Sequence, residues 1–381
     1  MTSSRRQFFH LGAGMAVASM AWPRKSLAHE FDLHSRQPHE DDGLIRLYSN
    51  ENAYGPSSRV MDAIRAAALN SNRYPRLRYG DLVERIAAAH QVAPDQVLVG
   101  CGSTEILRTA ACAFCGKGKR VIHAAPTFEA VQHYARAVDS ESLAVPLTPA
   151  YAHDLDRMLT AATSSPGLVY ICNPNNPTAS LTPRKDLEAF ISKLSGKTLV
   201  VIDEAYHHYA APSGMYASLL DRPVDYENVI VTRTFSKVYG LAGLRLGYAI
   251  ASPKVIERMR QFVNEDNINA IATEAAFVAL DDDAGTSHFI QQNANDRQEF
   301  FNQAMARMLK PIDSHANFVM MNTFHPAQEI IQHFRMNNIL IGRKFPPMYT
   351  YIRVSFGQPE EMLAFWRAWD LLPWSKNLMH H

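Results

Sequence analysis

Four short apolar segments of the chain each end in side chains that could bind a charged ligand or perform catalysis. The segment QVLVG leads to Ser103 and Thr104, GLVYIC to Asn176, TLVVID to Asp203, and NVIVTRTFSK to Thr234, Ser236 and Lys237. Runs of this kind, rich in Val and Ile, predict buried strands. Because ligands in an open α/β sheet bind outside the carboxyl ends of its strands, we expect these side chains to surround one crevice.

Lys237 is the residue in this set that could act as a nucleophile. Taken alone, a lysine is more often a solvated surface residue. A lysine that faces a crevice loses water, which lowers the pKa of its amine and makes the amine reactive toward carbonyl groups. Asp203 follows four apolar residues, and a carboxylate buried there needs a cation or hydrogen-bond donors. The two residues together favour a catalytic site.

A further group of residues is suited to an anion. The glycine turn at 100–102 leads into an expected helix at Ser103, and the free N–H groups at the start of a helix can bind a phosphate. Arg245, eight positions after Lys237, could hold the same anion because a guanidinium offers two parallel hydrogen bonds. We therefore expect an anion site beside the lysine.

An amine, a buried carboxylate and an anion site together match the requirements of pyridoxal phosphate. Its aldehyde reacts with an amine, its ring nitrogen needs a carboxylate to stay protonated, its phenolic oxygen takes hydrogen bonds, and its phosphate needs N–H groups, hydroxyls and an arginine. The sequence thus predicts this cofactor. No GxGxxG follows an expected strand, which disfavours a nicotinamide enzyme.

The elements that would position these groups alternate along the chain. We expect strands at 96–102, 120–126, 167–172, 197–203 and 228–237, and helices at 58–70, 103–115, 127–138 and 182–194. This order predicts an α/β fold, in which a mostly parallel sheet is covered by helices on both faces. After residue 264, expected helices at 272–282, 295–309 and 360–372 and short strands at 317–322, 339–345 and 350–357 predict a smaller α+β domain.

The predicted domain order is a linker and N-terminal arm at 29–62, a large cofactor-binding domain at 63–263 and a small domain at 264–381. Residues 1–28 are interpreted as a twin-arginine signal peptide. Arg5 and Arg6 precede an apolar run that is too short to span a bilayer, and the segment ends in Ser-Leu-Ala. An apolar first helix behind a basic tail is the alternative. We expect cleavage after Ala28, export by the twin-arginine machinery and a periplasmic protein.

Charge and cysteine content exclude several classes of function. Without residues 1–28, which hold four basic residues and no acid, the chain has 34 basic and 37 acidic residues, so no basic field for nucleic acid is expected. The four cysteines do not have zinc-site spacing, and CAFC at 112–115 lies in an expected helix as core residues. The histidines at 29–39 are interpreted as part of a polar linker, so no metal is predicted.

Nine motifs in order give the chain a resemblance to a known family. They are NENAYGP (50–56), RYPRLRYGDL (73–82), GCGSTE (100–105), APTF (125–128), NPNNPT (173–178), VIDEAYHHY (201–209), TFSKVYGLAGLRLGY (234–248), HANFVM (315–320) and YIRVSFG (351–357). With them the chain resembles the fold-type I pyridoxal-phosphate aminotransferases, closest to the histidinol-phosphate aminotransferase branch. The resemblance implies an aspartate-aminotransferase-like fold and a homodimer that acts on amino acids and 2-oxo acids.

The resemblance also implies a role for each matching residue. Lys237 would bind the cofactor aldehyde and then move a proton at the substrate α-carbon. Asp203 would pair with the ring nitrogen. The other implied roles are the phenolic oxygen for Tyr206 and Asn176, stacking on the ring for Phe128, the phosphate for Ser103, Thr104, Thr234, Ser236, Arg245 and the other subunit's Tyr74, and the substrate carboxylate for Arg353.

The chain departs from the family pattern at the turn NPTA and around the substrate side chain. Ala179 stands where the family has glycine, so the local turn is expected to differ if the position needs a positive φ. Arg343 stands where the branch often keeps an arginine for a substrate phosphate. Glu265 and Asp266 could form an acidic patch that prefers an amino group, or simply a solvated turn. The donor therefore stays open.

Other functions on the same scaffold also stay open. A decarboxylase, lyase or oxidase would share Lys237 and Asp203, and only the product separates them from an aminotransferase. A cofactor-binding sensor without turnover is a further alternative, although it would not be expected to keep the proton-moving lysine. The leading hypothesis is a periplasmic aminotransferase.

Overall fold

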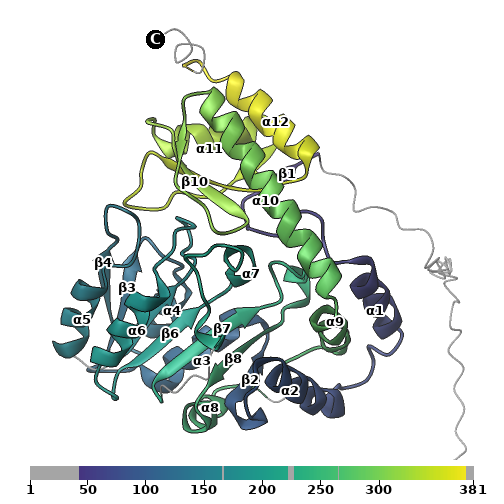
Figure 1. Ribbon diagram of the computed structural model, residues 1–381, viewed down its shortest axis with the longest axis vertical. Helices are drawn as coiled ribbons and strands as arrows, with labels where there is room; N and C mark the ends of the chain where they lie inside the picture. Colours follow the sequence, from purple (N-terminus) through teal and green to yellow (C-terminus); the bar gives the residue numbers. More distant parts are fainter. Residues whose placement is uncertain (1–42, 165–166, 222–226, 265, 375–381) are drawn as a thin grey trace, which may run out of the picture. The chain divides into compact units, whose positions relative to one another are not determined.

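A computed structural model of the protein describes residues 43–164, 167–221, 227–264 and 266–374. The predicted signal peptide, the linker up to residue 42 and Glu265 lie outside the described residues. Within them are a seven-stranded sheet and two smaller sheets (Figure 1). The seven-stranded sheet and the C-terminal elements have separate hydrophobic cores.

The larger sheet has seven strands in the order β2-β8-β7-β6-β5-β3-β4. Six strands run parallel, and β8 is antiparallel to both of its neighbours, β2 and β7. Their bounds are β2 (Val97–Gly100), β3 (Arg120–Ala125), β4 (Glu141–Pro146), β5 (Leu168–Cys172), β6 (Leu199–Asp203), β7 (Val229–Thr234) and β8 (Gly247–Ala251). The predicted mostly parallel sheet is confirmed, although β4 and β8 were not expected from the sequence.

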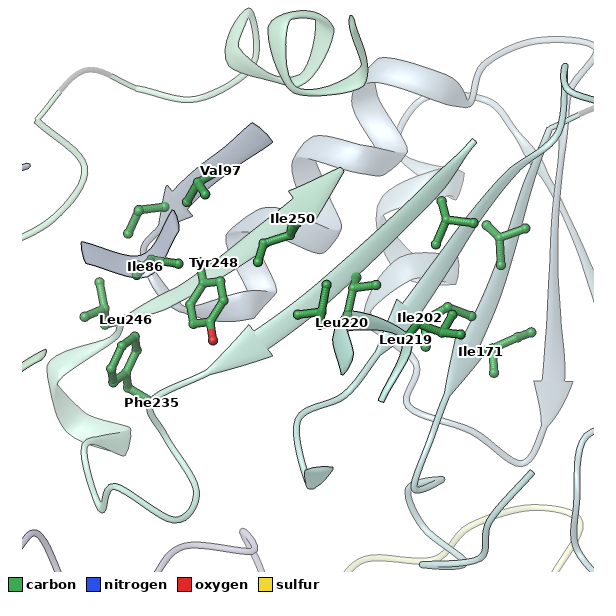
Figure 2. Packing of buried hydrophobic residues seen from close by; sticks show 14 of the residues in the cluster. Ile86, Val97, Ile171, Ile202, Leu219, Leu220, Phe235, Leu246, Tyr248 and Ile250 are labelled. Carbon is green, nitrogen blue, oxygen red and sulfur yellow. The ribbon is translucent and has the colours of Figure 1, made fainter. Parts of the chain in front are cut away.

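Helices cover both faces of this sheet. Alternate residues of each strand point to opposite faces, and both sets are apolar, so each face needs a covering layer. In β2, Val97 and Val99 join one core and Leu98 joins the other. The first face, part of which is shown in Figure 2, packs against α1 (Ser58–Ala68), α2 (Arg76–His90), α5 (Leu155–Ser164), α6 (Arg184–Lys193) and α9 (Ala270–Leu280). The second face packs against α3 (Gly102–Phe114), α4 (Ala130–Arg136) and α8 (Pro253–Arg260).

The smaller sheets are built mostly from the C-terminal part of the chain. Antiparallel strands form the order β12-β10-β9, and β1 pairs in parallel with β11. The elements are β1 (Ile45–Leu47), β9 (Lys310–Pro311), β10 (Phe318–Asn322), β11 (Ile339–Ile341), β12 (Tyr351–Ser355), α10 (Asp283–Ala306), α11 (Ala327–Met336) and α12 (Pro359–Asp370). Phe300, Phe334 and Phe365 fill the core between the three helices.

The two cores each draw on distant parts of the chain. Leu47 of β1, from the predicted N-terminal arm, is buried in the core of the C-terminal helices. Conversely, Ala272 and Ala276 of α9 pack in the core of the large sheet, although they follow residue 264. The domain boundaries therefore stay a prediction. None of the helices in the described part of the chain is both long and apolar enough to cross a membrane.

Candidate active site

A cavity of about 480 Å³ lies where the parallel strands of the large sheet end. The ends of β5, β6 and β7, the start of α3, strand β12 and the segment 48–51 after β1 all contribute to its lining. Every predicted site residue except Tyr74 lines this cavity: Ser103, Thr104, Phe128, Asn176, Asp203, Tyr206, Thr234, Ser236, Lys237, Arg245, Arg343 and Arg353. These predicted residues lie up to 250 positions apart in the sequence, from Ser103 to Arg353, and meet at one place.

Lys237 follows β7 and its amine is held by the N-terminal arm. Its Nζ donates hydrogen bonds to the carbonyl oxygens of Asn50, at 3.0 Å, and Ser49, at 3.3 Å. Burial, with a smaller contribution from the Arg353 charge, lowers the pKa of the Lys237 amine to about 8. A substantial neutral fraction is therefore present near neutral pH, as nucleophilic or general-base chemistry requires.

Asp203 is buried at the end of β6 and accepts hydrogen bonds from two neighbouring strands. The Tyr170 hydroxyl donates to Oδ2 at 2.8 Å, and Thr232 Oγ1 donates to Oδ1 at 3.2 Å. Burial raises the pKa of the Asp203 carboxyl, while these hydrogen bonds and the Lys237 charge oppose the rise. A cationic N–H group placed in the cavity would stabilise this buried carboxylate most.

Hydroxyl groups, a helix start and Arg245 gather at another end of the cavity. Thr234 Oγ1 donates to Ser236 Oγ at 3.0 Å, and Arg245 Nη1 approaches the same hydroxyl at 3.4 Å. A Cβ on Gly102, which has a φ of +74°, would lie 2.3 Å from Arg245 Nη2. Glycine is thus needed for the guanidinium to approach the start of α3. The free N–H groups and the cation there are suited to a phosphate.

Tyr206 and Asn176 share a hydrogen-bond network with a residue that the sequence analysis missed. The Tyr206 hydroxyl accepts hydrogen bonds from the side-chain amides of Asn50, at 3.0 Å, and Asn176, at 3.4 Å. The motif NENAYGP contains Asn50, but nothing in its spacing shows that it folds back onto β6. Tyr170 and Thr232, the partners of Asp203, were missed for the same reason, since each lies inside an apolar strand.

Arg353 lies on β12 of the three-stranded sheet and lines the cavity. Its Nη1 donates to Asn176 Oδ1 at 2.6 Å and its Nη2 to the Tyr48 carbonyl at 2.5 Å, while Nε has no hydrogen-bond partner among the described residues. Burial lowers the pKa of the Arg353 guanidinium to about 10. A buried guanidinium with unmet donors is suited to a planar carboxylate.

The remaining predicted residues lie at the opening of the cavity or away from it. Phe128 lines the cavity with its ring partly exposed. Arg343 lies at the opening and pairs with Glu129. Tyr74 is 75% exposed and does not line the cavity of its own chain, so its predicted contact with another subunit stays a prediction.

Two departures from the family pattern have structural outcomes. Ala179 has a φ of 59° and is fully buried, so the position does need a left-handed backbone, and alanine adopts it at a cost of about 1 kcal/mol. Asp266 forms an ion pair with Arg76 at 2.9 Å and is not part of the cavity lining. Of the two alternatives for Asp266, the structure supports the exposed turn and not an acidic patch beside the substrate.

The residues present fit pyridoxal phosphate. Among the described residues, Asp203 is buried without an ion-pair partner. Glycine at position 102 brings Arg245 to the start of α3, where an anion could bind, and the amine of Lys237 lines the same cavity. Each feature corresponds to one functional group of this cofactor.

Comparisons with known proteins agree with this assignment. The family described as "Aminotransferase class I and II" matches residues 42–368. The chain belongs to the class I and II aminotransferases. The expected fold-type I aminotransferase of the histidinol-phosphate branch is confirmed, and so are the aspartate-aminotransferase-like fold and the pyridoxal phosphate cofactor.

Three relatives of this aminotransferase illustrate the similarity. The chain is 33% identical over 327 residues to the histidinol-phosphate aminotransferase of Caldicellulosiruptor saccharolyticus, covering 85% of this chain and 90% of that protein. It is 39% identical over 239 residues to an aromatic amino acid aminotransferase of Rhodococcus erythropolis, covering 62% and 66%. The crystal structure of the Sinorhizobium meliloti histidinol-phosphate aminotransferase in complex with pyridoxal-5'-phosphate superimposes with a TM-score of 0.81 at 28% identity, covering 88% and 91%.

Proposed function

We propose that this aminotransferase takes the amino group from an L-amino acid and passes it to a 2-oxo acid, with Lys237 moving the proton. The observation that supports this most is the convergence of Lys237, Asp203 and Arg353 on one cavity. The reaction needs a nucleophilic amine, a buried anion and a cation that binds a carboxylate, and these three residues supply them. A sensor that only bound the cofactor would not need the amine at this position.

When bound, pyridoxal phosphate supplies an aldehyde that accepts the amino group and a protonated ring that withdraws electrons. Asp203 would keep the ring nitrogen protonated, and Tyr170 and Thr232 hold its carboxylate in place. Tyr206 and Asn176 would hydrogen-bond to the phenolic oxygen. Phe128 would cover one face of the ring.

Separate groups of residues in the cavity would bind the cofactor phosphate and the substrate carboxylate. Arg245 and the hydroxyls of Ser103, Thr104, Thr234 and Ser236 would hold the phosphate. Arg353 would orient the substrate through its α-carboxylate, which places the α-hydrogen toward Lys237. The neutral Lys237 amine would accept the α-proton of the substrate and hold it for return.

The donor is not given by the names of the relatives, since these include both histidinol-phosphate and aromatic amino acid aminotransferases. Decarboxylation, elimination and oxidation would use the same residues. We favour transamination because the family match covers nearly all of the chain after residue 42.

A homodimer and export to the periplasm are further parts of the proposal. The exposed Tyr74 on the loop before α2 supports a role in a partner's phosphate site. Residues 1–28, with Arg5 and Arg6 before a short apolar run, support a twin-arginine signal cleaved after Ala28. Folded export would allow the cofactor to be bound before the protein leaves the cytoplasm. Mass spectrometry of the mature N-terminus tests the cleavage site.

The experiment that tests the proposed function follows the absorbance of the purified holoenzyme while single amino acids are added without an oxo acid. Transamination converts the cofactor to its amine form, and a 2-oxo acid then restores the original spectrum. Release of CO₂ or ammonia in place of this reversible change would favour a decarboxylase, lyase or oxidase. No change with any donor would contradict the proposal.

A further inference from the structure

The cavity has an ion pair at its opening that the proposed reaction does not use. Arg343 follows β11, and its Nη2 lies 2.5 Å from Oε2 of Glu129, the residue just before α4. Arg343 lines the catalytic cavity, and both side chains are 54% exposed, so the pair lies where a substrate would enter.

Arg343 is held by more than this one contact. Its Nη1 donates to the Lys344 carbonyl at 2.7 Å, and its guanidinium lies 4.5 Å from the centre of the buried Phe345 ring. These contacts use one N–H donor on each Nη, and the Glu129 carboxylate neutralises the charge of the guanidinium. Glu129 therefore reduces the ability of Arg343 to bind an anion.

The other charges of the cavity have partners in the proposed reaction, on which this inference rests. Arg245 would meet the phosphate, Asp203 the ring nitrogen and Arg353 the α-carboxylate. Arg343 is then the cation in the lining that remains for a substrate side chain, and Glu129 neutralises it. Glu51 adds a further carboxylate to the lining. A phosphate or second carboxylate on the substrate would find more negative than positive charge there.

The uncharged part of the opening is aromatic. Phe345 is buried beneath both arginines, with the Arg353 guanidinium 4.8 Å from its ring centre. The rings of Tyr48 and Phe128 line the same cavity and are partly exposed. Phe128 is assigned to the cofactor, so Tyr48 and Phe345 are the aromatic residues left for the substrate, and they favour a substrate with a planar apolar group.

We propose that Glu129 is a specificity-determining residue, which by pairing with Arg343 selects amino donors with an uncharged, aromatic side chain over donors with a phosphate or a second carboxylate. Glu129 does not touch the reacting atoms and acts through Arg343. It lies in the segment APTFEA, between Phe128 and α4.

The test uses the holoenzyme with pyruvate as acceptor and compares kcat/KM for L-phenylalanine, L-glutamate and L-aspartate. For the wild-type protein we expect L-phenylalanine to be the best of the three donors. Glu129→Gln should raise the efficiency with the two anionic donors relative to L-phenylalanine by about 3- to 10-fold, mainly through KM, because a nearby negative charge is lost. The gain should shrink at high salt.

Three variants make the result specific to the ion pair. Glu129→Asp should restore most of the wild-type ratio, and Arg343→Gln should abolish the effect of Glu129→Gln. Glu141→Gln, which breaks the exposed pair with Arg120 on β3, is the matched control and should leave the ratio unchanged. A structural role of Glu129 would lower the efficiency with all donors equally and would overturn the inference.

The failure of this inference is distinct from the failure of the proposed function. A wild-type enzyme that transaminates but prefers L-aspartate or L-glutamate overturns the selection by Glu129 and leaves the proposed function standing. An unchanged donor ratio in Glu129→Gln does the same. A protein that converts none of the three donors, nor any other amino acid, overturns both.

Discussion

Arg353 Nη1 donates a 2.6 Å hydrogen bond to Asn176 Oδ1. This bond joins strand β12 of the three-stranded sheet to the turn after β5 of the seven-stranded sheet. The same Asn176 side chain donates to Tyr206 through its amide nitrogen. The groups proposed for the substrate carboxylate and for the phenolic oxygen are thus linked through one residue. A substrate carboxylate at Arg353 would compete for the bond to Asn176.

Arg353→Lys should lower kcat/KM for an L-amino acid by about 30- to 1000-fold, because a lysine cannot form two parallel hydrogen bonds with a carboxylate. The measurement is the half-reaction rate with the amino acid and with the amine that lacks its carboxylate. The amine should react at a similar rate in both proteins. An equal loss for both donors would show that Arg353 does not bind the carboxylate.

The lowered pKa of Lys237 predicts a specific pH dependence. The neutral amine is the reactive form, and its fraction rises with pH up to the pKa, about 8 in place of the ordinary 10.5. The rate at which the cofactor-free protein takes up pyridoxal phosphate covalently should therefore rise about tenfold per pH unit below 8 and level off above it. A rate that kept rising to pH 10 would contradict the shift. Lys237→Ala is the control without covalent uptake.

Asp203→Asn should lower kcat by about 100-fold or more, because it removes the charge that would keep the cofactor ring protonated. Asparagine keeps one acceptor oxygen, so it can accept from Tyr170 or from Thr232 but not from both, because these two donate to different oxygens of Asp203. Tyr170→Phe, which removes one of these bonds and keeps the charge, should cost about tenfold. The comparison is made at saturating cofactor. A larger loss in Tyr170→Phe than in Asp203→Asn would contradict the proposed role of the charge.

Glu204 and Arg233 form a buried ion pair of 3.0 Å beneath the site, and Ser218 Oγ donates to Glu204 at 2.6 Å. Glu204→Gln should lower the free energy of unfolding by about 3–5 kcal/mol, since it leaves a buried arginine without its anion. The exposed pair of Arg120 and Glu141 provides the control, and Glu141→Gln should cost less than about 1 kcal/mol. Denaturant unfolding of the cofactor-free proteins measures both. Equal effects would show that burial does not decide the cost.

The proposed role of Tyr74 in a partner's site can be tested with two inactive proteins. A mixed dimer of Lys237→Ala and Tyr74→Ala would contain one intact site and one with both defects. Refolding an equal mixture should then restore about a quarter of the wild-type activity, since half of the dimers are mixed and half of their sites are intact. No gain on mixing would place Tyr74 outside the partner's site. Sedimentation of the wild-type protein gives the oligomeric state.

The sequence alone was sufficient for the features that depend on local pattern. Apolar runs predicted β2, β3, β5, β6 and β7, because strands buried on both faces need continuous Val and Ile. The polar residues at their ends predicted the cavity, because parallel strands bring those ends to one edge. The alternating pattern did not predict β4, whose residues are mostly exposed, or β8, whose sequence Gly-Tyr-Ala-Ile-Ala has a single β-branched residue.

Only the tertiary structure decided which residues support the site from a distance. Asn50 reaches Tyr206 because the N-terminal arm folds back, and Tyr170 meets Asp203 across two paired strands. Glu129 and Arg343 are 214 positions apart and pair only because α4 and β11 approach the same opening. Such contacts depend on long-range packing, and local propensity carries no information about it. The residues that carry out the chemistry could therefore be predicted from the sequence. The contacts that we propose for substrate selection became visible only in the folded structure.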